Sequence, residues 1–433
     1  MHSFAPEILL ITILSLVILS DAIASKLKIP SVFILLIGSY LVYTYFKAAV
    51  PIDLAQNFTT VILFCIPLIF MGDALHLSFK DIKKHGWAIF YLAVVSVAIS
   101  IVAGASLSYF NIFEGLSLGG YVALFAINMA TDAVSVQSVL SRFKGIGHDI
   151  KVLIEGESLG NDATAVIAFF FIGLPWMLNG QIDATTATVD AIRVFILSTL
   201  IGLALGYGFY MLMKLFSDRR GELFAFVVEA YSAYLLGEHF HVSGILTLIV
   251  AIVATKAWID DDLANDTAKR TKSFLRTLRL GAIKSTTTDR LEYIYDMAKE
   301  FGYIAAVVIF FALAEMVDFK LLLEYKREIL IMFAVTTLIR AISMAKFAFI
   351  GDKIKAIKPV GFKGWFILTF SGMKGALSII LVHLIPDTFP HKEMFEAVTI
   401  GVVILSIFVY GIILWAYFTF KKDESKDNIF KRS

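Results

Sequence analysis

The chain has 433 residues, of which 58% are hydrophobic and 17% are charged, and its mean hydropathy is +0.81. Soluble domains carry about 45–50% apolar and about 25% charged residues, so this composition excludes a soluble enzyme and a disordered chain. The formal net charge of +2 gives no bulk basicity for binding nucleic acid, and the single cysteine, Cys65, cannot form a disulfide within the chain. A polytopic membrane protein remains.

Thirteen apolar segments are long enough to cross a bilayer, which requires about 20 mostly apolar residues. We expect helices near residues 7–24, 30–47, 57–77, 86–110, 116–141, 152–176, 188–214, 221–237, 241–259, 292–317, 326–349, 364–386 and 395–420. The runs are uniformly apolar, whereas strands of a membrane β-barrel alternate over about ten residues. The first segment lacks a basic leader and a small-residue cleavage site, so we interpret it as a retained span. The predicted fold class is an all-α polytopic membrane protein with about 13 transmembrane helices.

Lys and Arg residues are concentrated in alternate connections between these helices. Counted with the adjoining span ends, those connections hold 30 of the 38 basic residues, and the opposite side holds six. Because basic residues accumulate in cytoplasmic loops, we expect the N-terminus outside and the C-terminus in the cytoplasm. Residues 1–421 would form the transmembrane domain and 422–433 a short cytoplasmic tail. Residues 260–290 would form a cytoplasmic loop, either a topology anchor, which we favour, or a regulatory element.

Eight ionisable residues fall well inside the predicted spans, where each charge costs about 2.5–3.5 kcal/mol on insertion scales. They are Asp73, Asp132, Glu157, Asp162, Glu229, Glu315, Arg340 and Lys374. Six are acidic and two are basic, so pairing within the set cannot neutralise them all, and the surplus carboxylates favour bound cations or protons. Asp73 and Glu315 could instead lie near span ends and reach the membrane surface.

Two pairs of polar residues share faces of the sixth predicted helix. Glu157 and Asn161 are four residues apart, and so are Ser158 and Asp162. Gly156 and Gly160 have the same spacing, and their missing side chains allow another helix to approach closely. Asn and Asp also favour caps and turns, which is the alternative interpretation of Gly160-Asn-Asp taken alone.

One span earlier, Thr131 and Asp132 supply a hydroxyl or backbone carbonyl and a second carboxylate. Oxygen ligands of these kinds suit a small, hard cation. An empty site with two carboxylates in a low dielectric would carry a charge of −2. One or both carboxylates must therefore take up a proton or a cation. The pattern therefore predicts a site, formed around the carboxylates of Asp132 and Asp162, that holds either a cation or a proton.

The two basic residues fall late in the chain. Arg340 stays charged at any reachable pH, so it needs a carboxylate from another helix, and Glu157 is the candidate, with Asn161 held by the pair. Lys374 lies in a glycine-interrupted stretch, and paired interruptions in the two halves of a transporter often mark broken helices at the membrane midplane. The counterpart would lie near Asp132. Lys374 could offset negative helix ends at such a crossing, whereas plain helix packing is the alternative for the glycines.

Five segments resemble the monovalent cation:proton antiporter family, on the sodium/proton exchanger branch that carries an Asn-Asp motif. They are Ala130-Thr-Asp-Ala-Val, Gly156-Glu-Ser-Leu-Gly-Asn-Asp-Ala, Ser243-Gly-Ile-Leu-Thr-Leu-Ile-Val-Ala, Arg340-Ala-Ile-Ser and Phe370-Ser-Gly-Met-Lys-Gly-Ala-Leu-Ser. The resemblance implies an inverted-repeat antiporter fold with two crossed, interrupted helices in a six-helix core, roughly residues 57–176 and 292–386. A dimerisation scaffold of roughly residues 7–47 and 188–259 would lie beside it in a homodimer.

The resemblance also implies a function, namely Na⁺ (or Li⁺) exchange for H⁺ across the cell membrane by alternating access. Asp162 would bind the ion and the proton, and Thr131, Asp132 and Ser158 would complete the site. Glu157, Asn161 and Arg340 would form a supporting polar cluster. Asn161 implies electroneutral one-for-one exchange, because relatives with Asp-Asp at that motif are generally electrogenic.

Two departures from the family pattern are present. The family usually has Arg where this chain has Lys374, which keeps the charge and loses the bidentate geometry. Many relatives carry Glu in the third span, where the nearest acid here is Asp73, which could line the ion path or only flank it.

Several alternatives remain at the level of the sequence. Oxygen ligands do not fix ion size, so K⁺/H⁺ or broad monovalent cation exchange is the nearest alternative. A cation channel is more remote, since the charges are scattered over many helices of one chain. No hydrolase triad order, His-Glu-x-x-His motif or phosphate-binding loop suggests a membrane enzyme. We expect no cofactor, no transition metal and no nucleic-acid partner. Gly202, Gly206 and Gly208 form a close-packing strip for a subunit interface or an internal contact.

Overall fold

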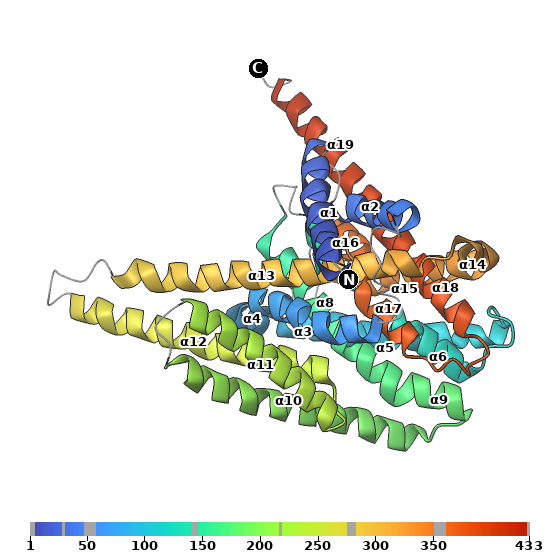
Figure 1. The fold of residues 1–433 in the computed structure, drawn as a ribbon, viewed down its shortest axis with the longest axis horizontal. Helices are drawn as coiled ribbons and strands as arrows, with labels where there is room; N and C mark the ends of the chain where they lie inside the picture. The colour runs from blue at the N-terminus through green and yellow to red at the C-terminus, as the bar shows by residue number, and fades with distance from the viewer. Residues whose placement is uncertain are drawn as a thin grey trace. The chain divides into compact units, whose positions relative to one another are not determined.

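The computed structural model of the chain describes residues 5–27, 31–46, 58–140, 146–215, 219–274, 283–349 and 361–430, and all regular elements in these ranges are helical (Figure 1). Each of the thirteen expected spans contains helix. Among the described residues, seven helical stretches are long and apolar enough to cross a membrane, and shorter apolar helices lie at 31–45, 60–76 and 118–127. The all-helical fold class is confirmed, whereas the number of thirteen spans stays a prediction.

The described residues of the first half of the chain form ten helices with three tighter or wider turns among them. They are α1 (Ala5–Leu27), α2 (Ser31–Phe46), α3 (Phe58–His76), α4 (Phe79–Phe90), η2 (Tyr91–Val95), α5 (Ser96–Ser106), η3 (Leu107–Phe110), α6 (Leu118–Ile127), α7 (Ala133–Leu140), α8 (His148–Ala168), η4 (Phe169–Gly173), α9 (Leu174–Asn179) and α10 (Ala184–Met213). The π-helical turns η2 and η4 join α4 to α5 and α8 to α9, so each pair continues as one long helix.

The second half continues the same pattern. Its elements are α11 (Arg219–His239), α12 (Gly244–Phe274), α13 (Ile283–Met316), α14 (Phe319–Glu324), α15 (Lys326–Phe349), α16 (Gly361–Phe370), α17 (Ala376–His383), α18 (Lys392–Leu405), η5 (Ser406–Tyr410) and α19 (Gly411–Phe430). One expectation needs correction. Residues 260–290 are not mainly a loop, because α12 continues to Phe274 and α13 begins at Ile283, with 275–282 outside the described residues. The stretch expected as a cytoplasmic tail is helical as far as Phe430, and its place in the cytoplasm stays a prediction. Both stretches carry polar helix formers that extend a helix beyond its apolar part.

The chain divides into two compact units. The first comprises residues 1–62, 87–187 and 306–433, and the second comprises residues 63–86 and 188–305. These boundaries differ from those of the core and scaffold that the family resemblance implies, since residues 7–47 fall in the first unit and most of α3 falls in the second. The division into transport core and dimerisation scaffold stays a prediction.

Two of the expected spans are interrupted, and both interruptions lie in the first unit. The expected helix 116–141 is broken between α6 and α7, and the expected helix 364–386 is broken between α16 and α17. The two breaks meet, because the backbone N–H of Asp132 donates to the carbonyl oxygen of Met373 at 2.8 Å. Backbone groups left unpaired by a broken helix need such partners inside a membrane protein. A Cβ on Gly375 would collide with Asp132, so this glycine permits the close approach.

The polar helix α8 is packed tightly against the helix formed by α4 and η2 in the first unit. A Cβ on Gly156 would lie 2.6 Å from Ile89 of α4, and a Cβ on Gly160 would lie 2.6 Å from Ala93 of η2. The expected close approach at these two glycines is therefore present. This close packing holds α8 against α4 and η2. It thereby sets the positions of the polar side chains that follow on α8.

The second unit contains α10, α11 and α12, which run side by side (Figure 1). A Cβ on Gly202 would lie 2.6 Å from the carbonyl oxygen of Thr247, and one on Gly206 would lie 2.7 Å from that of Ala251, whereas Gly208 has open space beside it. The structure thus assigns Gly202 and Gly206 to an internal contact between α10 and α12.

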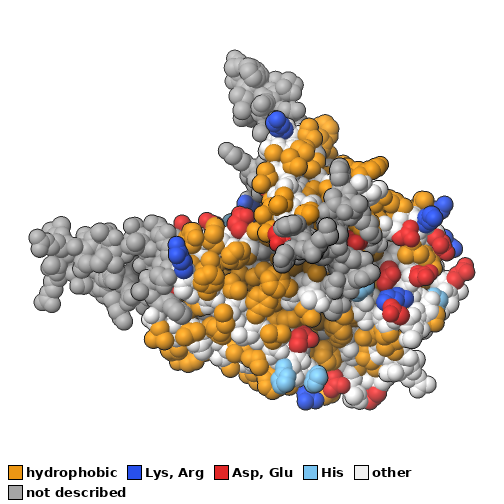
Figure 2. Space-filling view, viewed as in Figure 1, with side chains coloured by type: hydrophobic (Ala, Val, Ile, Leu, Met, Phe, Trp, Pro, Cys, Tyr) orange, Lys and Arg blue, Asp and Glu red, His pale blue; other side chains and the backbone are white. Residues whose placement is uncertain are grey.

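Hydrophobic side chains cover much of the described surface seen in Figure 2. On α1, for example, Ile11 and Ile18 are 64% and 68% exposed. A soluble protein would avoid such apolar surface, whereas a membrane protein presents it to lipid.

Candidate cation and proton site

Three side chains of α8 hold one residue of the first helix interruption. The carboxylate Oδ1 of Asp162 accepts the backbone N–H of Thr131 at 3.1 Å, and the hydroxyl of Ser158 donates to the Thr131 carbonyl at 2.9 Å. The amide of Asn161 donates to the Thr131 hydroxyl at 2.9 Å. All four residues are buried. Because α6 has ended before Thr131, its backbone groups lack partners in a helix, and the side chains of α8 supply them.

The helix α8 is continuous from His148 to Ala168, so Asn161 and Asp162 lie in its interior. The alternative interpretation of these residues as a cap or turn is therefore wrong. Asp132 lies in the interruption directly before α7, where the sequence predicted the counterpart of the break at Lys374. Its carboxylate accepts a hydrogen bond from the side-chain hydroxyl of Ser135, three residues later on α7. Asp132 is half-buried.

Arg340 of α15 lies beside Glu157, as the charge balance of the sequence predicts. Its two terminal nitrogens donate to the two carboxylate oxygens at 2.5 and 2.9 Å. The guanidinium also donates to the carbonyls of Leu368 and Thr369, near the end of α16. A cation is favoured at a helix C-terminus, where carbonyl groups remain unpaired. Asn161 was expected to be held by this pair, but its amide bonds Thr131 instead, and its buried Oδ1 has no hydrogen-bond partner among the described residues.

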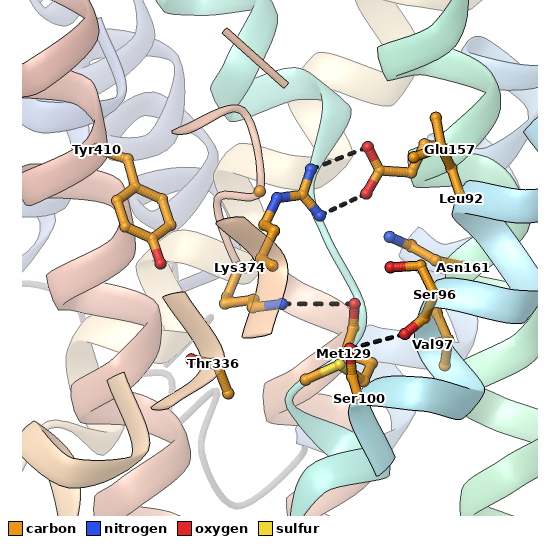
Figure 3. A pocket seen from close by; sticks show the side chains of 12 residues that line it. Leu92, Ser96, Val97, Ser100, Met129, Glu157, Asn161, Thr336, Lys374 and Tyr410 are labelled. Carbon is orange, nitrogen blue, oxygen red and sulfur yellow. Dashed lines mark hydrogen bonds and ion pairs between the residues drawn. The ribbon is translucent and has the colours of Figure 1, made fainter. Parts of the chain in front are cut away.

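Lys374 lies in the second interruption, and its side chain is buried. Its backbone N–H donates to the hydroxyl of Ser406 at 2.8 Å, and its amine approaches the carbonyl of Met129 at 3.5 Å (Figure 3). Met129 follows the end of α6, where helix carbonyls point along the negative end of the helix dipole. A positive charge on the Lys374 amine would therefore offset the negative C-terminal end of α6 at the crossing.

A small cavity of about 20 Å³, roughly enough for one water molecule, lies beside this arrangement (Figure 3). Its polar lining includes Ser96, Ser100, Asn161, Arg340, Lys374 and Tyr410. Sequence reasoning missed both serines and Tyr410. The serines are four residues apart in an otherwise apolar span, which is the one signal that could have found them.

A family model described as the transmembrane sodium/hydrogen exchanger matches residues 10–419. The chain belongs to the sodium/hydrogen exchanger family. This finding confirms the family that the sequence motifs indicated. The family consists of multi-pass membrane transporters that exchange sodium and protons, and it is not a family of enzymes.

Curated relatives of this chain carry consistent names. It is 27% identical over 352 residues to the Na(+)/H(+) antiporter ApNhaP of Aphanothece halophytica, covering 81% of this chain and 62% of that protein, which is less than two thirds of its length. It is 26% identical over 426 residues to the Na(+)/H(+) antiporter NhaH of Halobacillus aidingensis, covering 95% of this chain and 96% of that protein.

A solved structure shares the fold of this exchanger. The sodium proton antiporter MjNhaP1 from Methanocaldococcus jannaschii matches with a TM-score of 0.71 and 18% sequence identity, over 94% of this chain and 98% of that chain. At this level of identity the likeness shows the fold alone. It supports the all-helical membrane architecture described above.

Three ionisable residues of the predicted spans remain to be placed. Glu315 is half-buried at the penultimate position of α13, in keeping with a place near a span end. Asp73 lies on α3 in the second unit and is half-buried, so its place on an ion path stays a prediction. Glu229 is completely buried in the second unit.

One buried cation was not among the eight ionisable residues singled out from the sequence. Lys256, which the charge count includes at the cytoplasmic end of a predicted span, is only 5% exposed within α12. Its amine donates to the carbonyls of Leu75 and Leu77, the latter at 3.1 Å, and lies 4.6 Å from the centre of the Tyr295 ring. The amine therefore satisfies carbonyls at the end of α3, a pairing that the sequence does not reveal.

Proposed function

We propose that this exchanger is a secondary active antiporter in which Na⁺ (or Li⁺) and H⁺ compete for the carboxylate of Asp162. The observation that carries the proposal is the position of Asp162, buried on α8 and hydrogen-bonded at 3.1 Å to the backbone N–H of Thr131 at the break of a helix. A buried carboxylate is costly when it is charged and uncompensated. It therefore favours a bound proton or a bound cation over the empty state.

The neighbouring residues supply oxygen atoms suited to a small, hard cation. Ser158 and Thr131 contribute hydroxyl and carbonyl oxygens within the same hydrogen-bonded cluster, and Asp132 lies next to Thr131 at the crossing. Carboxylate, hydroxyl and carbonyl oxygens are the ligands that hard cations prefer. Protonation of Asp162 would remove the charge that holds the cation, so binding of one ion excludes the other.

The charges around Asp162 favour exchange of one cation for one proton. Glu157 and Arg340 neutralise each other in a bidentate pair, and Asn161 carries no charge. The carboxylate that changes its state is then Asp162, which carries the same net charge with either H⁺ or Na⁺ bound. Electroneutral exchange would not respond to membrane potential, which otherwise contributes about 2.3 kcal/mol per charge per 100 mV.

The wider architecture is proposed from the same evidence. Thirteen spans, with the N-terminus outside and the C-terminus in the cytoplasm, would form an inverted repeat in the cell membrane. The meeting of the two interrupted helices at Asp132 and Met373 supports a crossed pair in the transport core. In a homodimer, the core would move against the scaffold and expose the site to each side in turn.

The proposal is tested with purified protein in proteoliposomes that carry an imposed pH gradient. Dissipation of the gradient is measured on addition of Na⁺, Li⁺ or K⁺, with and without a clamped membrane potential, for wild type and Asp162→Asn. We expect Na⁺ or Li⁺ to dissipate the gradient equally at every potential, and Asp162→Asn to be inactive. A response to K⁺ would change the substrate assignment, a response to potential would overturn one-for-one exchange, and an active Asp162→Asn would overturn the site.

A further inference from the structure

A second buried carboxyl group lies in the second unit, on a helix that the proposed transport site does not use. Glu229 of α11 has no exposed surface, and its Oε1 lies 2.5 Å from the hydroxyl oxygen of Thr255 on α12. The same hydroxyl oxygen lies 2.9 Å from the backbone carbonyl oxygen of Gly206 on α10. Three neighbouring helices therefore meet in one short chain of oxygen atoms.

The number of hydrogen atoms available to join these three oxygen atoms depends on the charge of Glu229. A threonine hydroxyl has one hydrogen to donate. If Glu229 is ionised, the hydroxyl can donate to the carboxylate or to the Gly206 carbonyl, but not to both. If Glu229 is protonated, the carboxyl group donates to Thr255, and Thr255 donates to Gly206. Both contacts, Glu229 to Thr255 and Thr255 to Gly206, can therefore be hydrogen bonds only when Glu229 is protonated.

The surroundings of Glu229 also disfavour a negative charge. Its second oxygen, Oε2, is buried and has no hydrogen-bond partner among the residues that the structure describes, so an ionised carboxylate would keep an uncompensated oxygen. The cation nearest in sequence to Thr255 is Lys256, whose amine donates to the carbonyls of Leu75 and Leu77. Among the contacts described for Glu229, the polar partner is Thr255.

The packing around these three oxygen atoms leaves little space for a compensating ion. A Cβ on Gly206 would lie 2.7 Å from the Ala251 carbonyl oxygen and 3.2 Å from the Thr255 hydroxyl oxygen. The backbones of α10 and α12 thus approach each other directly at this point. A neutral hydrogen-bonded link suits such a seam, whereas a charge would need a partner that the seam does not hold.

We propose that Glu229 is a permanently protonated carboxylic acid that positions α10, α11 and α12 through Thr255 and is not among the protons exchanged in transport. The first part of this proposal stands on the geometry of the second unit alone. The second part rests on the proposed antiport, and the two parts are tested by different measurements.

The protonation state is measured by infrared spectroscopy of the purified exchanger in lipid. The wild-type spectrum should contain the carbonyl stretch of a protonated carboxylic acid that is missing in Glu229→Gln and persists when the pH is raised. In Thr255→Val, which removes the hydroxyl and keeps the shape, the band should shift to higher frequency because its hydrogen bond is lost. A wild-type spectrum without a band that depends on Glu229, or a band lost on mild alkalinisation, would overturn the proposal.

The positioning role is measured by stability and transport together. The amide of Glu229→Gln can donate to Thr255 as the acid does, so this variant should keep the wild-type melting temperature, pH profile and voltage response. Glu229→Ala should lower the melting temperature by several degrees, because it removes the link and leaves a cavity. A shifted pH profile or a new voltage response in Glu229→Gln would show that this proton is exchanged. If wild type does not transport in the same assay, the infrared result still decides the protonation state.

Discussion

Arg340 of α15 and Glu157 of α8 form a bidentate ion pair, with nitrogen–oxygen distances of 2.5 and 2.9 Å, although 183 residues separate them in the sequence. The Glu157 side chain is 3% exposed and the Arg340 side chain 12% exposed. The pair connects α8, which carries Asp162, to α15 and to the end of α16. It therefore holds the proposed site in place without adding net charge to it.

Substitution of one member of this pair should lower the stability of the protein more than substitution of both. Arg340→Gln leaves the Glu157 carboxylate buried and unpaired, which typically costs about 3–5 kcal/mol. In the double variant Arg340→Gln with Glu157→Gln, no buried charge remains, so the loss of stability should be smaller. Thermal unfolding in detergent compares the two variants with wild type.

The matched control is the exposed pair of Arg327 and Glu114, whose side chains are 65% and 83% exposed and 4.0 Å apart. Arg327→Gln should change stability by at most about 1 kcal/mol, because surface pairs contribute little. If the double variant is as unstable as Arg340→Gln alone, the harm does not come from an uncompensated Glu157.

The parts of the site that sequence reasoning found are those that involve charges and glycines in apolar spans. The cost of burying a charge made Glu157 and Arg340 candidates for a pair, and helical spacing placed Ser158 beside Asp162 on one face. Both signals arise from side chains, and the sequence reports side chains directly. The interruption at Lys374 was visible because glycines flank it on both sides.

The parts that sequence reasoning missed depend on backbone atoms. Every residue has a carbonyl group, so nothing in the sequence distinguishes that of Met373, which accepts the Asp132 N–H, or that of Met129, which faces Lys374. For the same reason the sequence does not reveal that the amine of Lys256 bonds carbonyls at the end of α3. Hydropathy also placed helix ends too early, because the polar extension of α12 to Phe274 lacks an apolar signal.

The hydroxyl of Ser158 should affect cation affinity more than protein stability. It donates to the Thr131 carbonyl at 2.9 Å and thereby fixes the residue that bonds Asp162. A hydrogen bond of this kind contributes about 1 kcal/mol, so Ser158→Ala should raise the half-saturating Na⁺ concentration about fivefold. The measurement is the Na⁺ dependence of exchange in proteoliposomes.

Ser100→Ala is the control for this substitution, since the Ser100 hydroxyl bonds the Ser96 carbonyl within its own helix. It should leave the half-saturating concentration within about twofold of wild type. Equal effects of the two substitutions would mean that Ser158 has no special relation to the site.

The helix crossing should tolerate no side chain at Gly375. A Cβ there would collide with the side chain of Asp132, and overpacking of this kind costs about 1–3 kcal/mol. Gly375→Ala should therefore lower both the melting temperature and the exchange rate. Gly208→Ala is its control, because nothing lies within 4 Å of a Cβ at that position, and alanine favours a helix by about 1 kcal/mol over glycine. A Gly375→Ala variant with wild-type stability would show that the two interruptions are not in contact.

Competition at Asp162 makes a prediction about pH. If Na⁺ and H⁺ exclude each other at one carboxylate, each tenfold rise in proton concentration should raise the half-saturating Na⁺ concentration about tenfold wherever the protonated form predominates, which corresponds to about 1.4 kcal/mol per pH unit. At higher pH the half-saturating concentration should become constant, and the maximal rate at saturating Na⁺ should not share this dependence. Exchange rates measured over a matrix of Na⁺ concentrations and pH values test this relation. A half-saturating concentration that stays constant over the whole acidic range would mean that the two ions bind at separate sites, and Asp162 would then bind at most one of them.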